Sequence, residues 1–195
     1  MQRVLFILVF LLFYSSTYAD SPPCWCKFEE ESSNKKYVAI VDRPLKDSLI
    51  DPWESIWTLT VYENTTQGKR QIWKIKYDYI GYPGGMLSDD GQTFTYIEFW
   101  YYANSPLVDI YRRGKKVNTS ALKGSNFKVP KDKLVQTVSH QLWLWNEGNA
   151  YSYTTNNKRL LLEIRSIDGR KHYIDISTGR FAFINQRAAN TSFVK

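Results

Sequence analysis

Residues 88–117 read SDDGQTFTYIEFWYYANSPLVDIYRRGKKV and contain the clearest fold signal in the chain. Two turn signals occur here, Asp90-Gly91 near the start and Gly114 near the end, because glycine tolerates the positive φ angles of tight turns. Between Thr93 and Glu98, aromatic side chains alternate with threonine. Successive side chains of a strand point to opposite faces of a sheet, so this alternation predicts antiparallel β structure.

The same unit, a short β run followed by a polar turn and another β run, recurs along the chain. WTLTVYE at 57–63 and QIWKIKYDY at 71–79 flank the turn NTTQGKR and predict an antiparallel hairpin. YVAIV begins at Tyr37, and two further runs flank Asp168-Gly169. This spacing of turns is typical of all-β domains.

Composition supports the same fold class. The chain has 7 Trp, 14 Tyr and 10 Phe, and large flat side chains pack well on pleated sheet faces. We predict an all-β protein of antiparallel sheets, in a sandwich-like or partial-propeller arrangement. At most one short helix is expected, near residues 131–138, because Leu134, Val138 and Leu142 are spaced by four.

The first 19 residues have the features of a secretory signal peptide. Arg3 precedes an apolar run at 4–14, and the small residues Thr17 and Ala19 precede the expected cleavage site. The run is shorter than the 20 or so residues of a spanning helix, so we predict a secreted or periplasmic protein with no membrane span after cleavage. The expected organisation is a signal peptide at 1–19, an N-terminal segment at 20–34, a single β domain at 35–184 and a flexible tail at 185–195.

Several phrases resemble known proteins. SDDGQTFTYIEFW at 88–100 resembles the hairpin of a β-propeller blade, and VDIYRRGKKV at 108–117 is similar to the strand pair that follows in such a blade. TVSHQLWLW at 137–145, NNKRLLLEI at 156–164 and YIDISTGRF at 173–181 resemble the second half of a family of small secreted bacterial proteins of unknown function. The resemblance implies a β-rich fold and a secreted location, and it implies no catalytic residues.

Cys24 and Cys26 are the only cysteines in the chain. Export places them in an oxidising compartment, which favours a disulfide. In an extended strand, residues i and i+2 are about 6.6–6.8 Å apart, whereas disulfides prefer about 5.5–6 Å between Cα atoms. A bond between them therefore requires a bend. Three interpretations remain open: a local disulfide, a redox-active or metal-binding thiol pair, and free thiols or a bond to another chain.

No pattern in the sequence predicts a catalytic site. Ser139 and His140 are neighbours, which point in different directions on a strand, and they match no nucleophile elbow. Asp89-Asp90-Gly91 lacks the alternating ligands and late glutamate of an EF-hand calcium loop. The two histidines, His140 and His172, are far in sequence from the two cysteines. We therefore predict no catalytic residues, no metal and no cofactor.

Charge and aromatic runs bear on possible partners. The net charge is +7, and the densest basic run is at 112–116. Such an excess fits either a solvated basic surface or an anionic polysaccharide or lipid partner, whereas export argues against nucleic acid. The runs EFWYY and LWLW place rings on both faces of a strand, and these rings either form a stacking surface or belong to the core. The candidates for that surface are Trp100, Tyr102, Trp143 and Trp145.

These observations favour a non-enzymatic exported β protein that acts by surface binding or in envelope assembly. Its expected partner is a protein or polysaccharide of the cell envelope. The alternative is a thiol-based redox or metal-handling role for Cys24 and Cys26.

Overall fold

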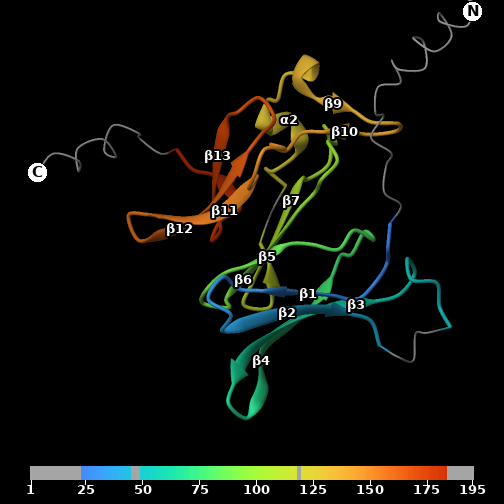
Figure 1. Cartoon of the computed structure of the whole chain (residues 1–195), viewed down its shortest axis with the longest axis vertical. Helices are drawn as coiled ribbons and strands as arrows, with labels where there is room; N and C mark the ends of the chain where they lie inside the picture. Colours follow the sequence, from blue (N-terminus) through green and yellow to red (C-terminus); the bar gives the residue numbers. More distant parts are fainter. Residues whose placement is uncertain (1–22, 45–48, 118–119, 184–195) are drawn as a thin grey trace, which may run out of the picture.

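The computed structural model describes residues 23–44, 49–117 and 120–183, in which strands form three four-stranded antiparallel sheets (Figure 1). The first sheet contains β1 (Phe28–Glu31), β2 (Tyr37–Asp42), β3 (Trp57–Thr65) and β4 (Gly68–Tyr77). The second contains β5 (Met86–Leu87), β6 (Thr93–Ile97), β7 (Val108–Arg112) and β8 (Lys115–Lys116). The third contains β11 (Tyr151–Asn156), β12 (Arg159–Arg165), β13 (Lys171–Asp175) and β14 (Arg180–Phe181). A separate hairpin is formed by β9 (Val135–Gln136) and β10 (Gln141–Leu142).

The predicted all-β antiparallel class is confirmed. Each four-stranded sheet keeps its strands in sequence order, which is the pattern of a propeller blade, and no sheet of the described residues closes into a barrel. The expected hairpin of β3 and β4 is present, with Leu59 opposite Ile75. The predicted signal peptide at 1–19 and tail at 185–195 lie outside the described residues. β1 falls within the predicted segment 20–34 and pairs with β2, so the first sheet already begins at Phe28.

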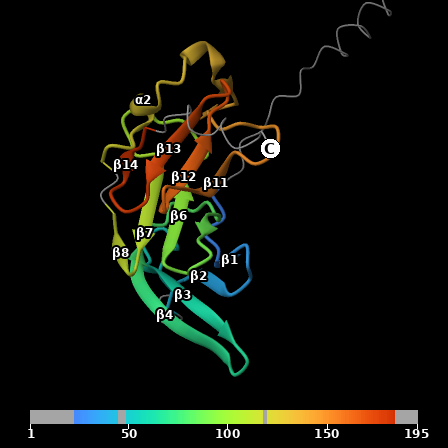
Figure 2. The same cartoon turned by 90° about the vertical axis from the view of Figure 1, so that its left-hand side faces the viewer.

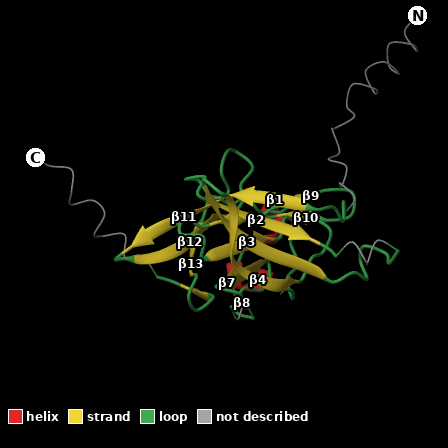
Figure 3. Cartoon of the chain, turned by 90° about the horizontal axis from the view of Figure 1, so that it is seen from below, coloured by secondary structure: helices red, strands yellow, loops and turns green. Residues whose placement is uncertain are grey.

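Helical structure is slight in the described parts of the chain (Figure 3). The helix expected near 131–138 is a 3-10 turn at Lys131–Lys133, and the backbone is extended in β9, which follows it. The 3-10 turn ends where Leu134 is extended, and β9 then pairs with β10. Thr137 Oγ1 donates to the His140 carbonyl at 2.9 Å and closes the β9–β10 turn. The sequence did not predict α2 (Gly124–Phe127), a single turn that ends where Lys128 has a φ of 53°.

The second sheet lies between the other two (Figure 2). On one face, Phe94 and Tyr111 pack into a buried cluster with Leu59 of the first sheet. On the other face, Ile110 packs into a second cluster with Ile174 of the third sheet. The alternation seen in the sequence of β6 is thus real, but both faces are buried. This arrangement accounts for apolar side chains on both sides of one strand.

The outer sheets turn polar faces away from the stack. In β4, Trp73 and Tyr77 are buried in the core, whereas Lys74 and Lys76 between them are exposed. An antiparallel sheet commonly keeps one face in solvent in this way. In the third sheet, Lys171 Nζ lies 2.7 Å from Glu163 Oε1 on the solvent side. The outer faces of the first and third sheets are therefore exposed to solvent.

One hydroxyl group fixes the third sheet to the second. The Oη atom of Tyr153 in β11 lies 2.8 Å from Thr95 Oγ1 and 3.1 Å from the Met86 carbonyl oxygen. Both partners belong to the second sheet, and Thr95 is fully buried. Burial raises the pKa of Tyr153 well above its ordinary value, so the hydroxyl remains protonated. This contact links β11 to both β5 and β6 of the second sheet.

Three hairpins use the same serine turn. In each, a buried serine donates its hydroxyl to a side chain two residues later, at 2.6–2.8 Å. The serine N–H returns to a carbonyl across the turn at 2.9–3.0 Å. Serine with Asp or Asn two positions on is well suited to such local bonding. The pairs are Ser32 with Asn34, Ser88 with Asp90, and Ser166 with Asp168.

Candidate functional site

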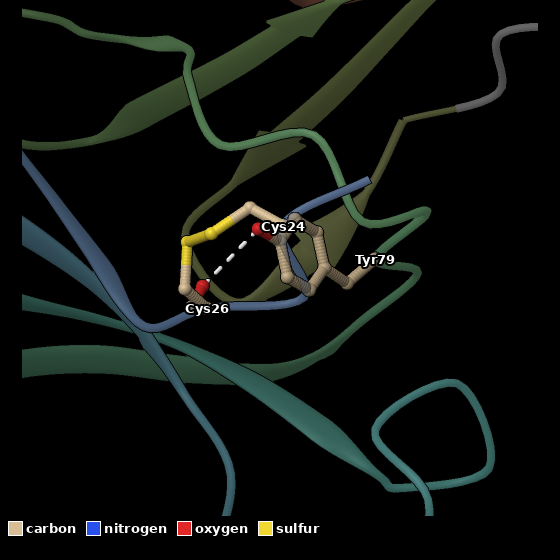
Figure 4. The surroundings of a disulfide bond; sticks show 3 residues. All are labelled: Cys24, Cys26 and Tyr79. Atoms are coloured by element: carbon tan, nitrogen blue, oxygen red, sulfur yellow. Dashed lines mark hydrogen bonds between the residues drawn. A yellow bond between two sulfur atoms is a disulfide. The ribbon is translucent and has the colours of Figure 1, made fainter. Parts of the chain in front are cut away.

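The Cys24–Cys26 loop is a tight turn closed by a disulfide (Figure 4). The two Cα atoms are 5.2 Å apart, which is within the range that disulfides occupy. Trp25 between them has a φ of 47°, in the left-handed region. This residue supplies the bend that a disulfide between residues i and i+2 requires. Of the three interpretations that the sequence left open, the structure shows the local disulfide.

Hydrogen bonds attach this loop to the chain between β4 and β5. The N–H groups of Cys24 and Trp25 donate to the Gly81 carbonyl at 2.7 and 3.2 Å. Tyr79 Oη donates to the Cys26 carbonyl at 3.1 Å (Figure 4). Burial raises the pKa of Tyr79 to about 12, so its hydroxyl keeps the proton that it donates. The disulfide therefore closes a loop that other contacts already hold, while Cys24 itself is exposed.

Two of the four predicted surface aromatics are buried, which corrects the candidate surface. Trp143 has no exposed area, and its Nε1 donates to the Glu98 carbonyl at 2.8 Å. Trp100 is 6% exposed and stacks on the His140 ring with 4.7 Å between centroids. The cause is a long-range pairing, because the two aromatic runs lie side by side and bridge at Trp100 and Leu142. Rings that face this pairing become core residues.

The other two predicted residues reach the surface, in different surroundings. Tyr102 is exposed, and its ring lies edge-on to His140 at 6.2 Å. Trp145 is half-buried. The Arg165 guanidinium lies 3.8 Å from the centre of the Trp145 ring, and Trp145 Nε1 donates to the Glu147 carbonyl at 2.6 Å. These two contacts hold the indole in one orientation.

Trp145 lines a groove of about 450 Å³ at the start of β11. We call it the aromatic groove, because Phe99 and Tyr151 also line it. Phe99 is 56% exposed, although it was not among the aromatic residues predicted to form a surface. The amides Asn146 and Asn149 contribute polar groups to the same wall. The remaining lining residues are Leu142, Leu144, Gly148 and Ala150.

A buried carboxylate positions Phe99. Glu98 is 4% exposed, and its Oε1 accepts the Trp100 N–H at 3.0 Å. Its Oε2 accepts the Tyr96 hydroxyl at 3.3 Å. Burial raises the pKa of Glu98, although these donors oppose the shift. Because Glu98 and Trp100 both point inward, the residue between them points out, and the Phe99 ring reaches the groove.

Ser139 and His140 do meet, contrary to the expectation that they diverge. Ser139 Oγ lies 2.8 Å from His140 Nδ1, because both residues lie in the β9–β10 turn rather than in a strand. Ser139 is exposed, and the His140 ring stacks on Trp100. This geometry differs from a nucleophile elbow, in which a strained strand-to-helix turn presents the serine.

Comparisons with known proteins add no assignment. No protein-family model matches the sequence, and neither a curated protein nor a solved structure matches the chain. Within residues 23–44, 49–117 and 120–183, no group of three or more His, Cys, Asp or Glu side chains is placed to hold a metal ion. The same residues include no helix that is long and apolar enough to cross a membrane.

Proposed function

We propose that this protein is an exported, non-enzymatic binding protein whose aromatic groove binds a sugar chain of the cell envelope. The observation that carries the proposal is the composition of that groove. Phe99 and Trp145 bring two accessible rings to one hollow, and Asn146 and Asn149 bring amides beside them. Ligand sites are typically concave and apolar, with a few polar groups that fix orientation.

Sugar rings suit this combination of groups. Their C–H faces pack against aromatic rings, and their hydroxyls exchange hydrogen bonds with side-chain amides. The Trp145 ring is already fixed by Arg165 and by the Glu147 carbonyl. A ring that is held before binding loses little conformational entropy when a ligand packs on it. The predicted signal peptide at 1–19 supports a location outside the cytoplasm, where such chains occur.

Binding of soluble hexasaccharides tests the proposal. Calorimetric titrations with hexamers of glucose, N-acetylglucosamine and galacturonic acid should reveal affinity for at least one of them. Phe99→Ala and Trp145→Ala should each weaken that binding at least about fivefold, since an aromatic contact contributes about 1 kcal/mol beyond area burial. Trp53→Ala is the matched control, because Trp53 is 60% exposed and lies outside the groove.

Two results would refute the proposal. One is that none of the three hexasaccharides binds. The other is that Trp53→Ala weakens binding as much as the groove variants do. Phe99 is exposed, so Phe99→Ala should leave the unfolding temperature nearly unchanged, and this measurement separates lost binding from lost folding.

A thiol-based role is the second candidate function. The observation in its favour is that Cys24 is exposed and lies in a three-residue disulfide loop, where a thiolate in solution can reach the sulfur. Equilibration in glutathione buffers, read by mass spectrometry, measures the reduction potential. A potential near those of oxidoreductases, about −120 to −270 mV, supports exchange chemistry, whereas one below about −300 mV indicates a structural bond.

A further inference from the structure

Six basic residues from two hairpins lie along one side of the second and third sheets. Two hollows of about 470 and 490 Å³ lie there and share Arg112, Ser177 and Thr178 in their walls. Because they share walls, they form one continuous depression, which we call the basic groove. β8 and β14 lie on the same side of the molecule in Figure 2. The basic groove and the aromatic groove have no lining residue in common.

Two hairpins supply the cations of the basic groove. The β7–β8 hairpin contributes the run at 112–116, and the turn between β11 and β12 contributes Lys158 and Arg159. These two segments are over 40 residues apart in the sequence. Asp175 is the only acidic residue in the walls of the two hollows. The cations are Arg112, Arg113, Lys115, Lys116, Lys158 and Arg159.

Most of this positive charge is not neutralised by the fold. Lys116 is the exception, because its Nζ lies 2.8 Å from Asp78 Oδ2 and 3.0 Å from Asp109 Oδ2. Arg113 Nε donates only to the neutral amide of Gln92, at 3.1 Å. Arg112 Nε is buried and has no hydrogen-bond partner among the described residues. Within the same residues, no acidic group lies within 4 Å of the cationic groups of Arg112, Lys115, Lys158 or Arg159. Asp175 attracts Arg159 at longer range, which helps to lower the pKa of Asp175.

We propose that the basic groove binds an anionic polysaccharide, through the sulfate, phosphate or carboxylate groups along its chain. Guanidinium groups match these anions with paired donors, and lysine adds compact positive charge. The hydroxyl groups of Ser177 and Thr178 lie in both hollows, where they can bond sugar hydroxyls. A row of like cations around an elongated depression suits a chain that carries repeated negative charge.

The walls of the groove favour a polysaccharide over two other polyanions. A membrane-binding surface usually adds exposed apolar or aromatic side chains, which enter the lipid. None of the exposed large hydrophobic residues of the described chain lines this groove. Proteins that bind single-stranded nucleic acid stack the bases on aromatic rings, and no aromatic residue lines either hollow.

Binding of dextran sulfate, compared with uncharged dextran, tests the proposal on the full exported chain. The sulfated polymer should bind at least about tenfold more tightly, and its affinity should fall as salt rises. The variant Lys115→Gln/Arg159→Gln should lose about tenfold in affinity, as expected for two charge-assisted contacts. The matched control is Lys131→Gln/Lys133→Gln, which removes the same charge from exposed lysines outside the groove and should lose less than about twofold.

Three results would overturn the proposal: no preference for the sulfated polymer, equal losses in the groove and control variants, or groove-dependent binding only to other polyanions. The last is examined with phosphatidylglycerol vesicles and a DNA duplex, either of which would identify another class of partner. Phe99→Ala should leave dextran sulfate binding unchanged, so failure of the aromatic groove and failure of the basic groove can be told apart.

Discussion

Replacing Tyr153 by phenylalanine should lower the free energy of unfolding by about 2 kcal/mol through the loss of one hydroxyl group. The Tyr153 Oη atom lies 2.8 Å from Thr95 Oγ1 and 3.1 Å from the Met86 carbonyl oxygen. Without it, the carbonyl loses a donor, and the fully buried Thr95 hydroxyl loses its partner. Each such loss costs about 1 kcal/mol or somewhat more. The change tests whether this contact, rather than apolar packing alone, docks the third sheet on the second.

Urea denaturation followed by tryptophan fluorescence measures the effect. With a slope near 2 kcal/mol per molar urea, the midpoint should fall by about 1 M. Tyr151→Phe is the control, because Tyr151 lies on the same face of β11 as Tyr153. The hydroxyl group of Tyr151 has no hydrogen-bond partner within the described chain. It should change stability by less than about 0.5 kcal/mol.

The double variant Tyr153→Phe/Thr95→Val sharpens this test. Removing both hydroxyls leaves no unpaired threonine hydroxyl, so the double variant should be more stable than the sum of the two single losses predicts. Equal losses in Tyr153→Phe and Tyr151→Phe, or strict additivity in the cycle, would refute the reasoning.

Three further outcomes can be checked by the same denaturation assay. Burial raises the pKa of Glu98 above its ordinary value near 4.5, so the protonated side chain stabilises the fold at low pH, and this stabilisation is lost as the pH rises through the raised pKa. The stability of Glu98→Gln relative to the parent should therefore increase between pH 4 and pH 8, and a constant difference would contradict the prediction. Cys24→Ser/Cys26→Ser should cost no more than about 1.6 kcal/mol, because the closed loop is tiny; a loss above about 3 kcal/mol would show that the disulfide does more than close a loop. Gly91→Ala should cost about 1–3 kcal/mol more than Gly148→Ala, because both have positive φ but only at Gly91 does an added Cβ meet an aromatic ring, at 2.5 Å; equal costs would rule out that clash.

Local pattern predicted the hairpins well, because alternation and turn residues act over a few neighbouring positions. The β3–β4 pair and the strands around Asp168-Gly169 formed as expected. The same alternation could not show that β6 is buried on both faces, since that depends on two sheets from distant parts of the chain. The expectation of at most one short helix near 131–138 was met by the 3-10 turn at Lys131–Lys133, but its length could not be read from the spacing of apolar residues, because β9 pairs with β10 and Thr137 closes the turn between them.

The candidate sites were harder to predict than the strands. Trp100 and Trp143 had the same local appearance as Trp145, and only the bridge between Trp100 and Leu142 decides which rings are covered. Phe99 could not be found either, because the inward direction of Glu98 and Trp100 on its two sides is decided by the same long-range pairing. The serine turns at Ser32, Ser88 and Ser166 carried a readable signal, a serine followed two positions later by Asn or Asp, but the motif is short and the intervals are uneven.

The stacking of sheets restricts where this protein can bind a ligand. Both faces of the second sheet are covered, so accessible hollows form where strands end and hairpins from different sheets meet. The two grooves lie at opposite ends of β11: Tyr151 at its start lines the aromatic groove, and the turn after Asn156 lines the basic groove. Six residues of strand span about 20 Å. Because Tyr153 fixes β11 against the second sheet, loosening that contact should disturb both grooves together, whereas substitutions within one groove should leave the other unaffected.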